Sequence, residues 1–308
     1  MQIFRSWEAL PADARGASVA MGNFDGVHLG HQAVIDLARA RDAVLGVVTF
    51  EPHPRRYFAP DAPPFRLMNA ETRANRLAKL GVAHLYELAF DAGLAAMTPE
   101  SFAREVLLGY LGVSHVVIGT DFRFGKGRAG TSGDLERFGA AMGFAVTAAQ
   151  LVAAGGAEIS STAIRTALSE GRPRDAARML GHWHRIDGEV RGGERRGRAL
   201  GYPTANMSID ELHPPKFGIY AVKVDVLTGP HQGSYLGAAS MGVRPMFGEN
   251  RPNLETFVFD FSGDLYGAHL SVALIDYLRP EAKFESLEAL VAQMDADCAQ
   301  AREILAAL

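Results

Sequence analysis

The sequence predicts two domains: an α/β domain with a parallel sheet over residues 1–181, and a small antiparallel β-barrel with a C-terminal helix over residues 182–308. In the first part, short β-branched runs alternate with amphipathic stretches rich in Ala, Leu and Arg, which is typical of βαβ units. In the second part, runs that alternate apolar with polar residues are joined by Gly and Pro turns, which favours a barrel. A chain of 308 residues is long enough for two cores.

The composition narrows the class of protein. A net charge of −4 and a hydrophobic fraction of 48% give no support for a broad nucleic-acid surface. Cys298 is the single cysteine, which excludes an intramolecular disulfide and suits a reducing compartment. No apolar run reaches the roughly 18 residues of a membrane span, and residues 1–16 lack the apolar core of a signal peptide. We therefore expect a cytoplasmic protein that binds neither membranes nor nucleic acid polymers.

Apolar and amphipathic runs place the elements of the first domain. We expect strands at residues 18–21, 43–50, 84–88, 115–119 and 144–150. We expect helices at residues 30–41, 71–80, 99–109, 131–142 and 161–169. Because ligands of such sheets bind at the carboxyl ends of the strands, functional residues are expected in the segments that follow each strand.

The segment Gly22–His31 lies between the first of these strands and the first helix. Its sequence, Gly-Asn-Phe-Asp-Gly-Val-His-Leu-Gly-His, places His28 and His31 at the strand-to-helix junction. Unpaired N–H groups and the positive end of the helix dipole attract phosphate there, and small residues let a polyphosphate approach the backbone. Two imidazoles three residues apart can face one ligand, so we predict a nucleotide-phosphate site.

Two other interpretations of the histidine pair stay open. A zinc site would need a third ligand, and none stands nearby in the sequence. His28 and His31 could also serve only to cap and pack the helix. A P-loop is excluded as the source of nucleotide binding, because no Gly-x4-Gly-Lys-Ser/Thr sequence occurs in the chain.

Three further segments at strand ends carry unusual residues. In residues 51–55, two prolines favour an extended turn that can hold His53 in a cleft. Residues 120–130 mix aromatic, cationic and glycine residues, which suits stacking and phosphate binding, although a solvated basic loop is the alternative. Residues 159–165 contain serines that favour a helix N-cap, worth roughly 1 kcal/mol, and a capped helix start can still bind an anion.

The second domain should follow a helix at residues 174–180. We expect its strands at residues 186–190, 218–224, 233–240, 254–261 and 269–278, and its closing helix at residues 287–305. Residues 191–206 read as a Gly/Arg loop that leads into a rigid Pro-Thr-Ala-Asn turn. Backbone amides of such a loop can hold phosphates while Thr204 and Asn206 offer neutral oxygens to Mg²⁺. Taken alone, the Gly/Arg part is more typical of a plain surface loop.

Glu255 is a carboxylate within an otherwise apolar expected strand. An unpaired buried charge is costly, so the side chain must face solvent or a polar cleft. Facing solvent is the common case. A carboxylate positioned in a cleft can instead accept a proton from a substrate, with a typical contribution of about 10²–10⁴-fold in rate.

Together these motifs resemble the bifunctional prokaryotic riboflavin kinase/FMN adenylyltransferase (FAD synthetase) family. The string Gly22–His31 is similar to the FMN adenylyltransferase branch of the nucleotidyltransferase superfamily, and residues 197–206 are similar to the riboflavin kinase signature. The motifs occur in family order over nearly the whole chain. The resemblance implies a Rossmann-like nucleotidyltransferase fold in the first domain and a riboflavin kinase-like barrel in the second. Ser240 and Met246 depart from the usual Asn and Thr.

The resemblance also implies roles for individual residues. The implied catalytic residues are His28, His31, Arg165 and Glu255. The implied ATP and phosphate ligands are Gly22, Asn23, Phe24, Gly30, Ser160, Ser161, Thr162, Gly197, Arg198 and Gly201. The implied flavin ligands are His53, Asp121, Phe122, Phe124, Arg128 and Arg244, and the implied Mg²⁺ ligands are Thr204 and Asn206.

The implied chemistry is ATP-dependent phosphorylation of riboflavin to FMN, followed by adenylylation of FMN to FAD with release of pyrophosphate. Glu255 would activate the riboflavin hydroxyl, whereas the FMN phosphate is already anionic and needs no general base. Two alternatives stay open: an adenylyltransferase of single activity that acts on another phosphorylated substrate, with the barrel as a binding module, and a flavin sensor without catalysis. The sequence also leaves open whether the chain forms a homo-oligomer.

Overall fold

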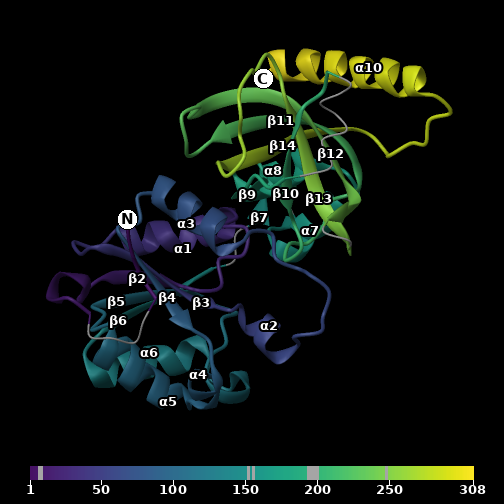
Figure 1. The fold of residues 1–308 in the computed structure, drawn as a ribbon. Helices are drawn as coiled ribbons and strands as arrows, with labels where there is room; N and C mark the ends of the chain where they lie inside the picture. The colour runs from purple at the N-terminus through teal and green to yellow at the C-terminus, as the bar shows by residue number, and fades with distance from the viewer. Residues whose placement is uncertain (6–9, 151–152, 155–156, 193–200, 247–248) are drawn as a thin grey trace. The chain divides into compact units, whose positions relative to one another are not determined.

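The computed structural model describes residues 1–5, 10–150, 153–154, 157–192, 201–246 and 249–308 (Figure 1). The chain divides into two compact units. The first unit contains Met1–Ala62 and Arg73–Ile159, and the second contains Pro63–Thr72 and Ser160–Leu308. The division at residues 159/160 precedes the predicted functional boundary at residues 181/182, which stays a prediction.

The first unit is built on a six-stranded parallel sheet with the order β1-β4-β3-β2-β5-β6. Its strands are β1 (Gln2–Phe4), β2 (Ser18–Met21), β3 (Leu45–Glu51), β4 (His84–Ala89), β5 (His115–Gly119) and β6 (Ala145–Ala149). The expected parallel α/β sheet is confirmed. The sequence pattern missed β1, because this edge strand is only three residues long and largely exposed.

Helices connect these strands. They are η1 (Ala12–Ala14), α1 (Leu29–Arg39), α2 (Pro54–Phe58), α3 (Ala70–Lys79), α4 (Ala92–Ala96), α5 (Pro99–Ser101), η2 (Phe102–Tyr110), η3 (Lys126–Arg128) and α6 (Ser132–Met142). A short hairpin of β7 (Ala153–Ala154) and β8 (Ala157–Glu158) follows β6. Helix α6 shows how the sequence sets the bounds: Thr131 and Asp134 form a capping box, and Gly143 ends the helix at φ 89°.

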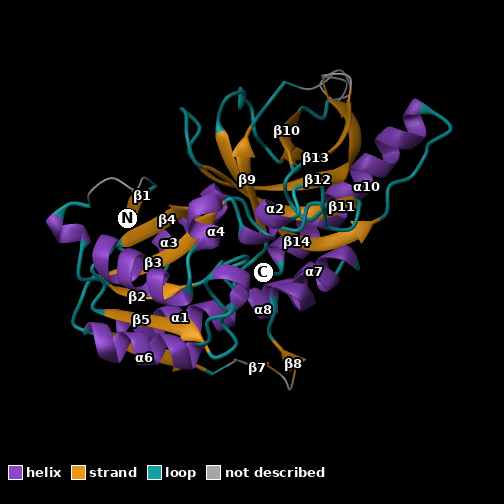
Figure 2. Cartoon of the chain, turned by 90° about the horizontal axis from the view of Figure 1, so that it is seen from below, coloured by secondary structure: helices purple, strands orange, loops and turns teal. Residues whose placement is uncertain are grey.

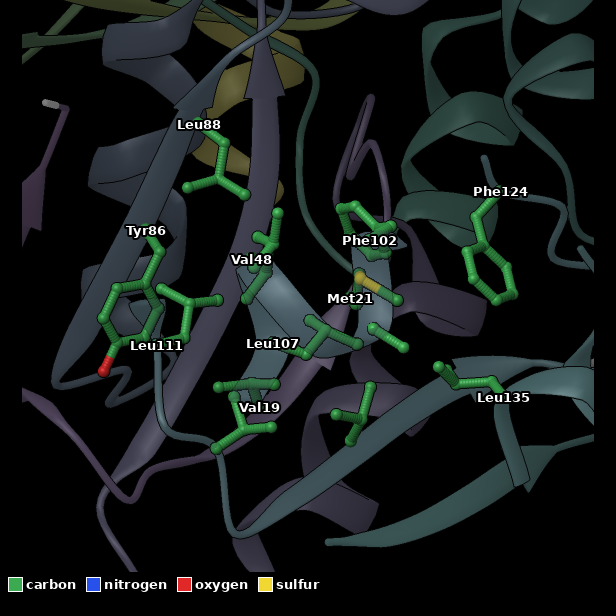
Figure 3. Close-up of a cluster of buried hydrophobic side chains, with 14 of the residues drawn as sticks. Val19, Met21, Val48, Tyr86, Leu88, Phe102, Leu107, Leu111, Phe124 and Leu135 are labelled. Carbon is green, nitrogen blue, oxygen red and sulfur yellow. The ribbon is translucent and has the colours of Figure 1, made fainter. Parts of the chain in front are cut away.

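The core of the first unit holds the sheet against its helices (Figure 3). Alternating residues of β2, β3 and β4 meet apolar side chains of the π-helix η2. The buried side chains include Val19, Met21, Val48, Tyr86, Leu88, Phe102 and Leu107. Because these strands are buried, the polar residues that serve a site are left to the segments beyond their carboxyl ends.

The second unit contains a six-stranded antiparallel sheet with the order β10-β13-β12-β11-β14-β9 (Figure 2). Its strands are β9 (Arg185–Glu189), β10 (Thr204–Ser208), β11 (Gly218–Val226), β12 (Gly233–Met246), β13 (Glu249–Val258) and β14 (His269–Arg279). An antiparallel bridge between Arg191 and Asn206 joins the two edges of the sheet. The sheet is therefore a nearly closed barrel, as expected.

Among the described residues of the second unit, the helices that accompany the barrel are α7 (Ser161–Ser169), α8 (Pro173–Leu180) and α10 (Leu287–Ala306). Ala301 and Leu305 of α10 pack on the outer apolar residues of the barrel. Leu67 is fully buried among residues of α7 and α8. His213 N–H also donates to the carbonyl of Arg66 at 2.8 Å. These contacts explain why residues 63–72 belong to the second unit.

Candidate active sites

His28 ends the loop between β2 and α1 and caps the helix. Its Nδ1 accepts the backbone N–H of His31 at 3.4 Å. A Cβ on Gly30 would lie 3.1 Å from both Nδ1 and Cε1 of His28, so glycine makes room for this ring. Because Nδ1 is an acceptor, the ring hydrogen of neutral His28 is on Nε2, which is therefore a donor.

The two imidazoles are stacked, with ring centroids 3.7 Å apart and planes 20° from parallel. The ring of buried Phe24 lies 5.1 Å from that of His31. Nδ1 of His31 is buried and has no hydrogen-bond partner among the described residues. Burial, and then the nearby His28, hold the pKa of His31 well below its usual value. His31 is therefore neutral at neutral pH, and can act on a phosphate by donating a hydrogen bond.

The loop before His28 brings backbone close to the same helix start. Gly22 is buried, and the carbonyl of half-buried Asn23 accepts the Thr49 hydroxyl at 3.2 Å. Phe24 adopts φ 51° although it is not glycine, a conformation that folded surroundings must maintain. The structure thus brings together the residues predicted between Gly22 and His31.

The segment after β3 differs from the expected extended turn. His53 instead caps the short helix α2, and its Nδ1 accepts the N–H of Arg55 at 3.0 Å. Pro54 fits this first helical position because its missing N–H would have no partner there. The sequence analysis missed two exposed aromatic residues of α2: Tyr57 and Phe58, which is 67% exposed, contact the ring of Phe90 edge-on. Adjacent aromatics within a charged segment were the available signal.

The loop after β5 combines a buried aromatic with exposed cations. Phe124 is 6% exposed and packs on Phe102, while half-buried Phe122 lies parallel to it at 6.2 Å. Asp121 is exposed. Arg128 is also exposed and makes no ion pair within the part of the chain that the structure describes. The burial of Phe124 leaves it able to form only the wall of a flavin site, and its predicted role stays untested.

The start of α7 belongs to the second unit. Ser160 caps the helix, since its hydroxyl accepts the N–H of Ala163 at 3.2 Å, which confirms the predicted cap. The Arg165 guanidinium donates to the Thr162 hydroxyl and to the carbonyl of Phe65, both at 3.3 Å. Ser161 is half-buried. These residues form one group at a helix N-terminus, where an anion is favoured.

The Pro-Thr-Ala-Asn sequence is not the rigid turn that was expected. Thr204 and Asn206 lie on strand β10, where pairing with β13 fixes their positions. This pairing places Asn206 directly opposite Glu255, so the two side chains share one face of the barrel wall. Glu255 is half-buried rather than fully exposed.

A cavity of about 350 Å³ lies beside these strands. Its lining comes from β10, from β13 with the segment that follows it, and from the residues just after β9 and just before β10. It comprises Val190, Pro203, Thr204, Ala205, Asn206, Thr256, Val258, Phe261, Ser262, Gly263, Asp264, Leu265 and Tyr266, so the lining contains Asn206 but not Glu255. Apolar walls with a few polar groups are the usual composition of a small-molecule site. No group of three or more His, Cys, Asp and Glu that could hold a metal occurs among the residues described.

Asn253 was not singled out from the sequence. It is 2% exposed, and its Nδ2 lies 3.5 Å from Oδ1 of Asn206 and 3.5 Å from Oε1 of Glu255. Of the remaining predicted residues, Gly201 is exposed with φ 84°. Gly197 and Arg198 lie outside the described residues. Arg244 pairs with Arg251 through the β12 and β13 backbones, and its side chain is not described.

Both parts of the chain are similar to known protein families. The FAD synthetase family model matches residues 10–163, and the riboflavin kinase model matches residues 180–305. A bifunctional riboflavin kinase/FMN adenylyltransferase of Pseudomonas fluorescens is 40% identical over 99% of this chain and 98% of its own length. The chain belongs to the bifunctional riboflavin kinase/FMN adenylyltransferase family. The member from Escherichia coli strain K12 is 38% identical over 95% of this chain and 94% of its own length.

A solved structure has the same fold over almost the full length of this family member. It is titled a macrolide-efflux protein from Streptococcus pneumoniae, with a TM-score of 0.80 and 30% identity, and the match covers 96% of this chain and 97% of that one. Among the described residues here, no helix is long and apolar enough to cross a membrane. Because both family models match, the chain carries both domains that the resemblance implied.

Proposed function

We propose that the chain phosphorylates riboflavin to FMN at the barrel, with Glu255 as the base, and adenylylates FMN to FAD at the histidine pair. The two activities follow from family membership, with adenylylation assigned to residues 10–163 and kinase activity to residues 180–305. We keep the functional boundary at residues 181/182. The observation that carries the kinase assignment is the direct strand pairing of Glu255 with Asn206, which lines the cavity.

In the kinase reaction, the nucleophile is a neutral hydroxyl, so a proton acceptor is needed. Glu255 takes the proton of the riboflavin 5′-hydroxyl as that oxygen attacks the γ-phosphate of ATP, and ADP leaves. The half-buried carboxylate is held on a barrel strand, which restricts its motion. The Glu255 carboxylate therefore contributes to the reaction by being held in position before the substrate binds.

The residues of β10 suit a magnesium ion that arrives with ATP. Thr204 offers a hydroxyl and Asn206 an amide oxygen, both at the cavity, and oxygen donors are the type that Mg²⁺ prefers. Neither donor is charged, so the phosphates of ATP must supply the negative ligands. The ion, when bound, neutralises charge on the transferred phosphoryl group.

In the adenylylation reaction, the FMN phosphate is the nucleophile and attacks the α-phosphate of ATP, so that pyrophosphate leaves. His28 and His31 stabilise the developing charge with N–H donors beside the helix N-terminus. We assign the ATP phosphates also to Gly22, Asn23, Phe24, Gly30, Ser160, Ser161, Thr162 and Arg165. We assign flavin binding in the first unit to His53, Asp121, Phe122, Phe124 and Arg128, and flavin binding at the barrel to Arg244. We assign the phosphates of the ATP used by the kinase to Gly197, Arg198 and Gly201.

We also propose a cytoplasmic location, supported by the single cysteine and by bacterial relatives.

The test is to incubate the pure protein with riboflavin, ATP and Mg²⁺ and to separate the products by chromatography. We expect FMN to appear first and FAD to follow with release of one pyrophosphate per FAD. Protein supplied with FMN in place of riboflavin should make FAD directly. Failure to form FMN would contradict the kinase assignment, and FMN that never becomes FAD would contradict the adenylyltransferase assignment.

A further inference from the structure

Asn253 lies on β13 two residues before Glu255, so both side chains point to the same face of the strand. The residue is 2% exposed, and its amide nitrogen is within 3.5 Å of both Glu255 Oε1 and Asn206 Oδ1. We propose that Asn253 is a positioning residue of the kinase, which holds the base and the magnesium ligand in one hydrogen-bonded chain. This inference rests on the roles proposed above for Glu255 and Asn206.

The chemistry of the neighbours fixes the orientation of the Asn253 amide. Both atoms that it faces, a carboxylate oxygen and an amide oxygen, are acceptors. The end of the amide that faces them must therefore be the NH₂ group, which has one hydrogen for each. The opposite orientation would set its oxygen against a carboxylate.

The series of hydrogen bonds continues from Asn206 to Thr204. The Nδ2 of Asn206 donates to the carbonyl of Thr204 at 3.3 Å, which fixes the amide so that Oδ1 is the end turned to Asn253. One buried amide thus links the proton acceptor to the proposed magnesium ligand. Distances of 3.5 Å are long for hydrogen bonds, but catalytic hydrogen bonds are often long without substrate and shorten in the reactive complex.

Asn253 also carries a cost that packing does not explain. Its Oδ1 is buried and has no hydrogen-bond partner among the described residues. A buried unpaired polar atom destabilises the folded state, and a leucine, which has the same branched arrangement of side-chain heavy atoms, would not carry that cost. If Asn253 served only the structure, an apolar residue could replace it without loss of kinase activity. If Asn253 is a positioning residue, the same replacement should lower kcat.

The experiment compares Asn253→Leu with the wild type in steady-state kinase assays. We expect kcat to fall about 10–100-fold, the usual cost of losing a group that orients a ligand, while the KM for riboflavin changes less than about 2-fold. The melting temperature should stay level or rise, and adenylylation of supplied FMN should be unchanged. Asn253→Gln, which keeps the NH₂ group, should recover part of kcat.

Asn253→Asp covers the case in which the leucine variant does not fold, because it keeps the shape and replaces the donor by an acceptor. Its kcat should fall at least as far. Ser208→Ala is the matched control, since Ser208 pairs with Asn253 across β10 and β13, and its kcat should stay within about 2-fold.

A double-mutant cycle separates the two proposals. If Asn253 acts through Glu255, then adding Asn253→Leu to Glu255→Gln should lower kcat by less than about 2-fold further. Full multiplication of the two losses would overturn the positioning of Glu255 by Asn253, and wild-type kcat in both Asn253→Leu and Asn253→Asp would overturn the positioning role as a whole. Wild-type kcat in Glu255→Gln would instead overturn the proposed base.

Discussion

The two candidate sites meet different chemical demands with different side chains. At the start of α1, two stacked imidazoles stand at a helix N-terminus, and one of them is buried and neutral. On the barrel, a half-buried carboxylate stands on a strand, paired with Asn206. A phosphate nucleophile is already anionic, whereas a hydroxyl must lose a proton. The first site therefore needs hydrogen-bond donors directed at the developing charge, and the second needs a proton acceptor.

The largest effect should come from removing the acceptor. Glu255→Gln keeps the shape but cannot take a proton, so kinase kcat should fall about 10²–10⁴-fold. FMN supplied from outside should still be converted to FAD at the normal rate. The measurement is separate assays of both reactions. Equal loss of both activities would show a folding defect and break the contrast between the sites.

Removing a donor from the first site should have a smaller effect, and this effect should fall on adenylylation instead of the kinase reaction. His31→Ala should lower FAD formation about 10²–10³-fold, or roughly 3–4 kcal/mol, as for the loss of one oxyanion-type donor. Kinase activity should persist, which makes it the internal control. Because His31 is neutral, its pKa predicts no gain in adenylylation between pH 8 and pH 6. Near-normal FAD formation by the variant would reduce His31 to a capping role.

Each unit buries a neutral histidine, and only the first has a proposed ligand. His184, in the second unit, is 2% exposed; burial, and then His182 and His213, lower its pKa to about 3. The unfolded chain binds a proton below its ordinary pKa of 6.5 and the folded chain does not, so this stability is present above pH 6.5 and is lost as the pH falls. Between pH 6.5 and pH 5 the loss should be about 2 kcal/mol.

Urea unfolding of the wild type and His184→Gln at several pH values tests this linkage. The variant should be less stable at neutral pH, but should lose about 2 kcal/mol less on acidification to pH 5. Parallel pH profiles for the two proteins would contradict a neutral His184.

The smallest effect on activity should come from cutting the chain at residues 181/182. The apolar cores of the barrel lie wholly after this point, and the group of Leu67 with α7 and α8 lies wholly before it. Fragment 182–308 should therefore fold and keep kinase kcat within a few-fold, without making FAD. A cut at 159/160 separates Leu67 from α7 and should yield less stable pieces. A folded fragment 182–308 without kinase activity would show that its site needs residues of the first part.

The local sequence pattern predicted the bounds of elements that are set by their own residues. The strand expected at residues 115–119 and the helix expected at residues 161–169 have those bounds in the structure. The pattern gave the wrong bounds where pairing with a neighbouring strand determines how far a strand extends. Strand β13 begins at Glu249, before the expected residue 254, because its partner β12 extends to Met246 and imposes the register. Pairing with β13 likewise makes a strand of Thr204 to Ser208.

The site residues divide in the same way. His28 and His31 could be predicted, because a histidine at a strand-to-helix junction is a local signal. The burial that keeps His31 neutral depends on its three-dimensional surroundings. Asn253 could not be found from the sequence, because its link to Asn206 exists only through the strand pairing of the barrel.

The path of the chain constrains how such a protein can be assembled from parts. It passes between the two units at residues 62/63, 72/73 and 159/160, so no single crossover point in a gene transfers the second unit whole. A chimera that takes its barrel from a relative would still carry residues 63–72 from its own first half. In such a chimera the carbonyl of Arg66 would accept its hydrogen bond from the relative's residue at the position of His213. Exchange of halves between family members should thus give a more stable chimera when this short segment is exchanged with the barrel.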